Sequence, residues 1–124
     1  MSSSETLDIV LVAPDPVPFA DLLMRLRAAN HRIWELRDSG SALVFLLDNR
    51  ADVVIVDSAV KGMRGLELVP LVTKVRPTAR VITVVDEGSL ADLRRVLAPG
   101  IYCHSLKPVD QDRILEAIYS VHKT

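Results

Sequence analysis

VVIVD, at residues 53–57, is the stretch of sequence that best indicates how this chain folds. A short run of β-branched residues without polar alternation is typical of a strand buried on both faces, and such strands occur mainly in parallel sheets covered by helices. Asp57 would stand at the carboxyl end of that strand, where open α/β sheets bind their ligands. Asp57 is therefore a candidate site residue. The alternative is that its carboxylate only caps the following loop by accepting hydrogen bonds from backbone N–H groups.

The segments on either side of this stretch alternate between strand and helix patterns. Apolar runs predict strands at residues 8–13, 31–37, 80–85 and 101–106, and apolar residues spaced by three and four predict helices at 17–29, 39–47, 66–75, 89–97 and 110–121. This alternation predicts an α/β fold: a doubly wound five-stranded parallel sheet in the order 2-1-3-4-5, with five helices and right-handed crossovers. Residues 7–122 would form one domain, preceded by a flexible N-terminal tail at residues 1–6.

Composition excludes several function classes. The chain has 124 residues, of which 49% are hydrophobic, and its 15 basic and 16 acidic residues leave a formal net charge of −1. That balance gives no general attraction to nucleic acid or to anionic membranes. The single cysteine fits a reducing compartment, and the polar start lacks a signal peptide. We therefore expect a cytoplasmic domain that binds neither nucleic acid directly nor a membrane.

Four short motifs occur in a fixed order on these elements. They are VVIVD at 53–57, GMRGLEL at 62–68, APG at 98–100 and LKP at 106–108. In this order they resemble the receiver domain of two-component response regulators, over roughly residues 7–122. The resemblance implies the flavodoxin-like (CheY-like) fold and a cytoplasmic role in phosphorelay signal transduction. It also implies that the chain is not an enzyme, apart from self-catalysed phosphotransfer and dephosphorylation.

The resemblance assigns the phosphoryl chemistry to two residues. Asp57 matches the phosphoacceptor, a carboxylate nucleophile that takes a phosphoryl group from a sensor histidine kinase or another phosphodonor. Lys107 matches the lysine that pairs with the phosphate. The alternative for Lys107 is a purely structural ion pair with Asp57. Under either interpretation the two side chains should meet at one edge of the sheet.

The metal-binding positions depart from the family pattern. Ala13 and Pro14 stand where a receiver usually has two adjacent acids. The remaining oxygen ligands would be the carboxylate of Asp57 with that of Asp15 or of Asp86, and the backbone carbonyl of Ala59. Mg²⁺ is usually held by one or two carboxylates together with water. The resemblance thus implies Mg²⁺, and the loss of the acidic pair counts against it.

The conformational switch positions are also altered. Val85 occupies the position of a small hydroxyl residue, and Thr83 lies two residues back, about 6–7 Å along the strand. His104 replaces the usual Tyr or Phe. Asp86 stands beside the acceptor where a small residue is common, so its carboxylate would repel an incoming phosphoryl group.

Two classes of function follow from these matches and departures. The first is a working receiver that accepts a phosphoryl group on Asp57. The second is a pseudo-receiver, a protein-interaction module that works independently of phosphorylation. In either class the family's usual partner surface is the helix at 89–97, the strand at 101–106 and the last helix. Opposite charges on that surface suggest a homodimer, through Arg94 and Arg95 against Asp110, Asp112 and Glu116.

Overall fold

The sheet has the predicted topology. The computed structural model describes residues 6–60, 62, 65–86 and 101–120, and within these ranges five parallel strands run in the order β2-β1-β3-β4-β5. The strands are β1 (Asp8–Val12), β2 (Arg32–Leu36), β3 (Val53–Asp57), β4 (Arg80–Val85) and β5 (Ile101–Leu106). The predicted α/β class and strand order are confirmed.

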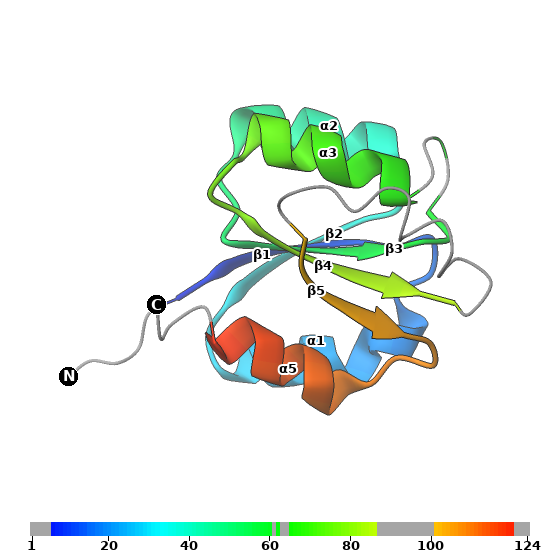
Figure 1. Cartoon of the computed structure of the whole chain (residues 1–124). Helices are drawn as coiled ribbons and strands as arrows, with labels where there is room; N and C mark the ends of the chain where they lie inside the picture. Colours follow the sequence, from blue (N-terminus) through cyan, green and yellow to red (C-terminus); the bar gives the residue numbers. More distant parts are fainter. Residues whose placement is uncertain (1–5, 61, 63–64, 87–100, 121–124) are drawn as a thin grey trace.

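Helices cover both faces of the sheet. The helices in the described ranges are α1 (Ala20–Ala28), α2 (Ser39–Asp48), α3 (Gly65–Val75) and α5 (Gln111–Ser120). In Figure 1, α2 and α3 lie above the sheet and α1 and α5 below it. Four α-helices are therefore described where the sequence predicted five, because the helix predicted at 89–97 lies outside the described residues. The predicted N-terminal tail also falls almost wholly outside them.

The first predicted helix is shorter than expected. The sequence predicted one helix over 17–29, but the structure has a 3-10 turn, η1 (Val17–Phe19), before α1 begins. Pro18 has no N–H to donate, so the chain closes a tighter turn in which the Phe19 N–H donates to the Pro16 carbonyl at 2.8 Å. At the other end, Asn30 adopts the predicted left-handed conformation with φ 68°.

Two apolar clusters bury the two faces of the sheet. Alternate residues of the central strands point to opposite sides, so Ile55 packs toward α1 and α5, whereas Val54 and Val56 pack toward α2 and α3. All of β3, including Asp57, is buried. Each fully buried Val or Ile side chain contributes about 1.5–3 kcal/mol relative to an exposed one. The burial of β3 on both faces, predicted from VVIVD, is confirmed.

Both ends of α2 are held by side chains. At the start, Asp38 Oδ1 accepts a hydrogen bond from the Ser41 N–H at 2.8 Å. At the other end, Arg76 follows α3 and donates to the carbonyls of Leu46 at 2.8 Å and Leu47 at 3.3 Å. A helix leaves its last carbonyls without intrahelical partners, and a cation there also complements the helix dipole. Arg76 therefore ties α3 to the C-terminal end of α2.

The loop after β3 passes close to the start of α2. Gly62 has φ 95°, and a Cβ built on it would lie 2.8 Å from Ser39 Oγ. Both the conformation and the space at this position require glycine.

No helix in the described ranges is long and apolar enough to cross a membrane.

Candidate functional site

Asp57 and Lys107 meet at the carboxyl edge of the sheet. The Nζ atom of Lys107 lies 2.7 Å from Asp57 Oδ1, and their side chains are 29% and 7% exposed. The same oxygen accepts a hydrogen bond from the Ala59 N–H at 2.8 Å. The predicted convergence of the acid and the ammonium group is confirmed, and Asp57 also caps the following loop as the alternative interpretation expected.

The fold brings these two residues together although they are far apart in the sequence. β4 lies between β3 and β5, and in the register Asp57 pairs with Val84 while Val85 pairs with Leu106. The Lys107 N–H continues this ladder by donating to the Val85 carbonyl at 2.7 Å. Because parallel strands end at the same edge, the side chains that follow β3 and β5 can reach each other across the end of β4.

Burial explains why Asp57 needs its partners. A carboxylate removed from water is costly unless it is paired and hydrogen-bonded. The ammonium group of Lys107 balances its charge, and the Ala59 N–H supplies a second donor to the same oxygen. The acid therefore lies in a satisfied resting arrangement.

The two positions where the family usually has acids offer no carboxylate beside Asp57. Ala13 is buried with its N–H donating to the Leu36 carbonyl, and neither Ala13 nor Pro14 has a carboxylate. Asp15, the ligand suggested by the sequence, is exposed, and its Oδ1 accepts from the Val17 N–H at 3.0 Å. Across the described ranges, no three His, Cys, Asp or Glu side chains are grouped as a metal site. Of the suggested carboxylate ligands, Asp57 lies at this edge and is paired with Lys107, whereas Asp15 accepts from the turn at Val17.

The switch positions offer little to an incoming phosphoryl group. Val85 is fully buried and apolar. Thr83 is also buried, and its Oγ1 has no hydrogen-bond partner among the described residues. His104 is exposed, and its carbonyl accepts from Arg113 at 3.4 Å. Asp86 follows β4 and is exposed.

Sequence reasoning missed one hydroxyl in this region. Ser58 directly follows Asp57, and its N–H donates to the Val84 carbonyl at 2.9 Å. Its Oγ is buried and has no hydrogen-bond partner within the part of the chain that the structure describes. Ser58 begins the turn that follows β3. Its position next to the acid was the only signal available in the sequence.

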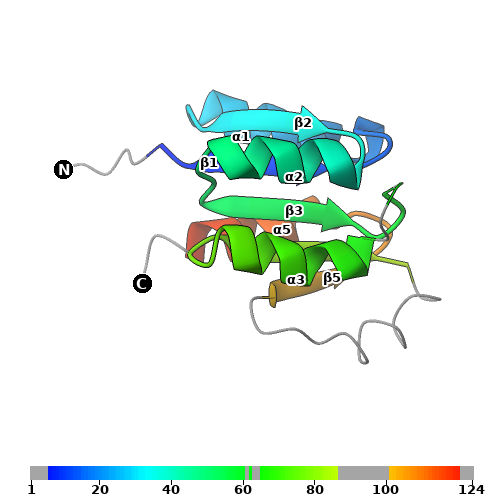
Figure 2. The same cartoon turned by 90° about the horizontal axis from the view of Figure 1, so that it is seen from above.

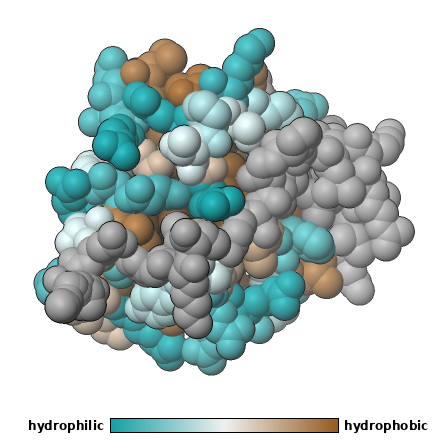
Figure 3. All heavy atoms as spheres, turned by 60° about the vertical axis from the view of Figure 1, so that its left-hand side comes forward, coloured by the Kyte–Doolittle hydropathy of each residue, from teal (hydrophilic) through white to brown (hydrophobic). Residues whose placement is uncertain are grey.

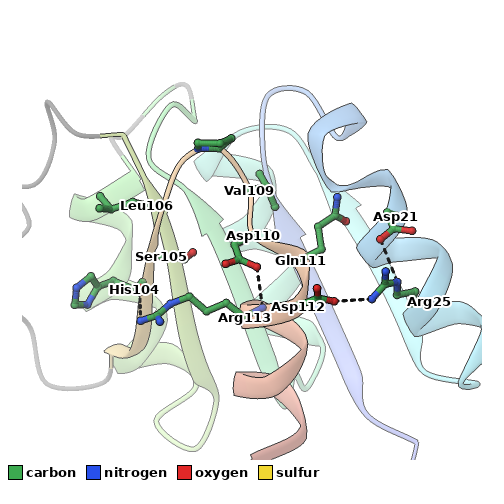
Figure 4. Close-up of a pocket in the computed structure, with 11 residues that line it drawn as sticks. Asp21, Arg25, His104, Ser105, Leu106, Val109, Asp110, Gln111, Asp112 and Arg113 are labelled. Carbon is green, nitrogen blue, oxygen red and sulfur yellow. Dashed lines mark hydrogen bonds and ion pairs between the residues drawn. The ribbon is translucent and has the colours of Figure 1, made fainter.

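A separate cavity of about 840 Å³ lies between α1, the end of β5 and the start of α5. Figure 4 shows Arg25 of α1 between Asp21 and Asp112, with nitrogen-to-oxygen distances of 3.1 and 2.8 Å. The hydrogen bond with Asp112 and then the charge of Asp21 raise the pKa of Arg25. Asp110 caps α5 by accepting from the Arg113 N–H at 3.1 Å, as predicted. Arg25 is thus paired with two acids of this cavity, and neither Asp57 nor Lys107 lines it.

Comparison with known proteins identifies the family. The family model of the response regulator receiver domain matches residues 9–119. The chain belongs to the response regulator receiver family. The retained Asp57–Lys107 pair and the strand order of this receiver fit that membership.

Relatives with known names agree with this assignment. The receiver is 28% identical to transcriptional regulatory protein GlrR of Escherichia coli strain K12 over 116 residues, which are 94% of this chain and 26% of that protein. It is 30% identical to sporulation initiation phosphotransferase F of Bacillus subtilis strain 168 over 88 residues, 71% of each chain. The receiver thus spans about a quarter of the length of the transcriptional regulators it matches.

Solved structures share the fold. A CheY-like response regulator receiver domain protein from Methanospirillum hungatei JF-1 superposes with a TM-score of 0.85, covering 96% of both chains at 22% sequence identity. At that identity the similarity supports the arrangement of strands and helices. The chemistry at the carboxyl edge depends on the receiver's own residues.

Proposed function

We propose that this receiver is a protein-interaction module in two-component signal transduction whose output does not depend on phosphorylation of Asp57. The observation that carries the proposal is the loss of the acidic pair that receivers usually have beside that acid. Asp57 Oδ1 is shared by Lys107 and the Ala59 N–H, and Ala13 and Pro14 provide no carboxylate where the family usually has two. The carboxyl edge of the sheet therefore holds an ion pair and lacks the acidic pair that receivers use to hold a divalent cation.

The altered switch supports the same conclusion. A hydrogen bond to a charged acceptor contributes about 1.5–3 kcal/mol, which is comparable to the few kcal/mol that separate two populated conformers. Val85 has no hydroxyl to make such a bond, and Thr83 lies two residues back in β4. A phosphoryl group on Asp57 would thus lack the contact that normally moves the end of this strand.

A second candidate function is a working phosphoacceptor. Receiver domains interact with phosphodonors such as histidine kinases, and the 2.7 Å contact between Asp57 and Lys107 is the observation that favours this candidate. In that case a carboxylate oxygen of Asp57 would take the phosphoryl group of a phosphohistidine, and Lys107 would pair with the phosphate. Asp86 would oppose the transfer by charge repulsion.

Either function places the receiver in a signalling pathway of the cytoplasm, without catalytic turnover of its own. Its protein partner would contact β5, α5 and the segment at 89–97, for which the sequence predicts the fourth helix of the fold. Direct contact with nucleic acid is not part of the proposal, since the net charge is −1.

Backbone amide NMR distinguishes the two functions. We expect the amide chemical shifts of Asp57, Val85 and Lys107 to remain unchanged when Mg²⁺ is added to about 10 mM, a concentration above the millimolar affinities of weak divalent-cation sites. They should also remain unchanged when a beryllofluoride phosphoryl mimic is then added. Matching shifts at all three residues would overturn the proposal and favour the phosphoacceptor.

A restored variant supplies the matched positive control. The triple substitution Ala13→Asp, Pro14→Asp and Val85→Thr returns the two acids and the hydroxyl to the carboxyl edge of the sheet. This variant should respond to Mg²⁺ and the mimic at Asp57 and Lys107. The same variant carrying Asp57→Asn should not respond.

A further inference from the structure

Helix α1 has no local side-chain cap at its amino-terminal end. Phe19 precedes the helix, and its side chain accepts no hydrogen bond from the first turn. The first N–H groups of an α-helix lack intrahelical partners, and the residue before the helix commonly supplies one through its own side chain. In this receiver the acceptor comes from far along the chain, because Oε1 of Gln111, the first residue of α5, accepts from the Leu22 N–H. Gln111 therefore caps α1 from another helix.

Two weaker contacts join the same two helices. Nε2 of Gln111 lies 3.5 Å from the Pro18 carbonyl oxygen, which makes a long hydrogen bond. Asp112 pairs with Arg25 at 2.8 Å, but the Asp112 side chain is 84% exposed, and an ion pair so open to water contributes little. Figures 1 and 2 show α1 and α5 side by side on one face of the sheet, and polar residues predominate along the lower surface of the molecule, where these helices lie (Figure 3). The half-buried bond from Leu22 to Gln111 is thus the contact with which water competes least.

The same glutamine ends the segment that carries Lys107 to the site. Lys107 follows β5, and its N–H is fixed on the Val85 carbonyl at 2.7 Å. Val109 packs against the apolar cluster between the sheet and the layer of α1 and α5, a contact that is not directional. Gln111 then makes the first described hydrogen bond after Lys107 that joins this segment to another element. Residues 107–111 are therefore held on β4 at one end and on α1 at the other.

We propose that Gln111 is a positioning residue for the ion pair of Lys107 with Asp57. A lysine side chain is flexible and has many rotamers, so its 2.7 Å contact with Asp57 Oδ1 depends on where the backbone of residues 107–111 lies. By fixing that segment on the first turn of α1, Gln111 keeps the ammonium group within reach of the carboxylate. The carboxyl edge of the sheet is therefore coupled to the contact between α1 and α5. Both candidate functions contain this ion pair, so the inference does not rest on whether Asp57 is phosphorylated.

A double-mutant cycle in urea tests the coupling in the full chain. Gln111→Ala removes the cap of α1, and Lys107→Met removes the ammonium group that the cap would position. The factor by which Gln111→Ala lowers the equilibrium constant of folding should be about fivefold smaller in the Lys107→Met background, a coupling within the range found for residues of one network. If Gln111 only caps α1, Gln111→Ala will lower the constant by the same factor in both backgrounds, and the proposal is overturned.

Two further variants separate positioning from a general loss of contacts on α1. Arg27→Gln is the matched control, because Arg27 ties α1 to Glu35 of β2 at 2.7 Å and does not touch residues 107–111. Its effect should be the same factor with and without Lys107→Met. Gln111→Glu keeps an oxygen acceptor for the Leu22 N–H, so it should preserve the ion pair. Circular dichroism checks folding, and Gln111→Asn, whose amide is one methylene shorter, replaces Gln111→Ala if that variant does not fold.

Amide NMR of the same variants reports on the ion pair directly. The Ala59 N–H donates at 2.8 Å to the oxygen that Lys107 contacts, so its chemical shift is sensitive to loss of the ammonium group. We expect Gln111→Ala to shift the Ala59 amide in the same direction as Lys107→Met, whereas Arg27→Gln and Gln111→Glu should leave it unchanged. An Ala59 amide at its wild-type position in Gln111→Ala would overturn the proposal, even if that variant is less stable. These spectra are recorded without Mg²⁺ or a phosphoryl mimic, so their outcome is independent of the phosphorylation test.

Discussion

Replacing Lys107 with methionine tests whether the ion pair at the carboxyl edge holds the fold together. Methionine keeps most of the length and apolar volume of the lysine side chain but removes the ammonium group that lies 2.7 Å from Asp57 Oδ1. Asp57 would then keep the Ala59 N–H as its remaining donor among the contacts described for that oxygen. We expect Lys107→Met to be clearly destabilising.

The size of the effect follows from burial. Removing one partner of a buried ion pair costs about 3–5 kcal/mol, because the other charge is left without compensation. The Asp57 side chain is 7% exposed, which makes it a buried charge, whereas Lys107 is 29% exposed. Water can replace part of the lost ammonium group, so we expect about 3 kcal/mol, at the lower end of that range. For a domain of this size the melting temperature should fall by roughly 9–15 °C.

Urea unfolding followed by fluorescence measures this loss. Trp34, the single tryptophan of the chain, is half-buried on β2 and reports on the sheet. Lys74→Met, at an exposed position in the last turn of α3, is the matched control and should cost under about 1 kcal/mol. Adding Asp57→Asn to Lys107→Met should recover part of the loss, because the uncompensated charge is removed. Equal losses for Lys107→Met and Lys74→Met would refute the reasoning.

Three further predictions concern the elements around α2. Arg76→Gln should lower the free energy of unfolding by about 1–2 kcal/mol in urea titrations, because the last carbonyls of the helix lose a charged donor; an unchanged midpoint would contradict this. Gly62→Ala should lower the melting temperature by several degrees, corresponding to about 1–2 kcal/mol from its positive φ and its approach to Ser39, and a wild-type melting curve would count against it. Hydrogen bonds from Ser41, first from its backbone N–H, hold the pKa of the Asp38 carboxyl below its usual value. The ionised Asp38 therefore stabilises the folded chain fully above the pKa that this carboxyl has in the unfolded chain. This stabilisation is lost as the pH falls through the lower pKa of the folded chain. Asp38→Ala should therefore be less stable than wild type at pH 7, and the difference should shrink below about pH 4 in pH-dependent thermal melts.

Local sequence predicted many element boundaries correctly. β4 and β5 begin and end at the predicted residues, and Asp110 caps α5. Such features depend on nearest neighbours and on side chains that bond to their own backbone, so they can be inferred without tertiary contacts. The first helix was predicted less well, since Pro18 tightened its opening turn.

The direction of single polar side chains could not be predicted in the same way. Asp15 was a candidate metal ligand, but its carboxylate accepts from the Val17 N–H and is exposed. Arg76 gave no signal in the sequence, although it bonds to two carbonyls of α2. Both outcomes depend on how neighbouring turns and helices are placed in space, which a local sequence pattern does not specify.

The sequence by itself determined the succession of strands and helices along the chain, the burial of VVIVD and the position of Asp57 at the end of a strand, because hydrophobic periodicity and turn residues act locally. It also determined that Ala13, Pro14 and Val85 bring no polar group to that edge. Only the tertiary structure decided that Lys107 reaches Asp57 at 2.7 Å and that Ala42 and Leu46 of α2 are buried while Val44 and Leu47 stay exposed. These features depend on which strand ends and helix faces meet in space, and they arise only when the whole sheet assembles.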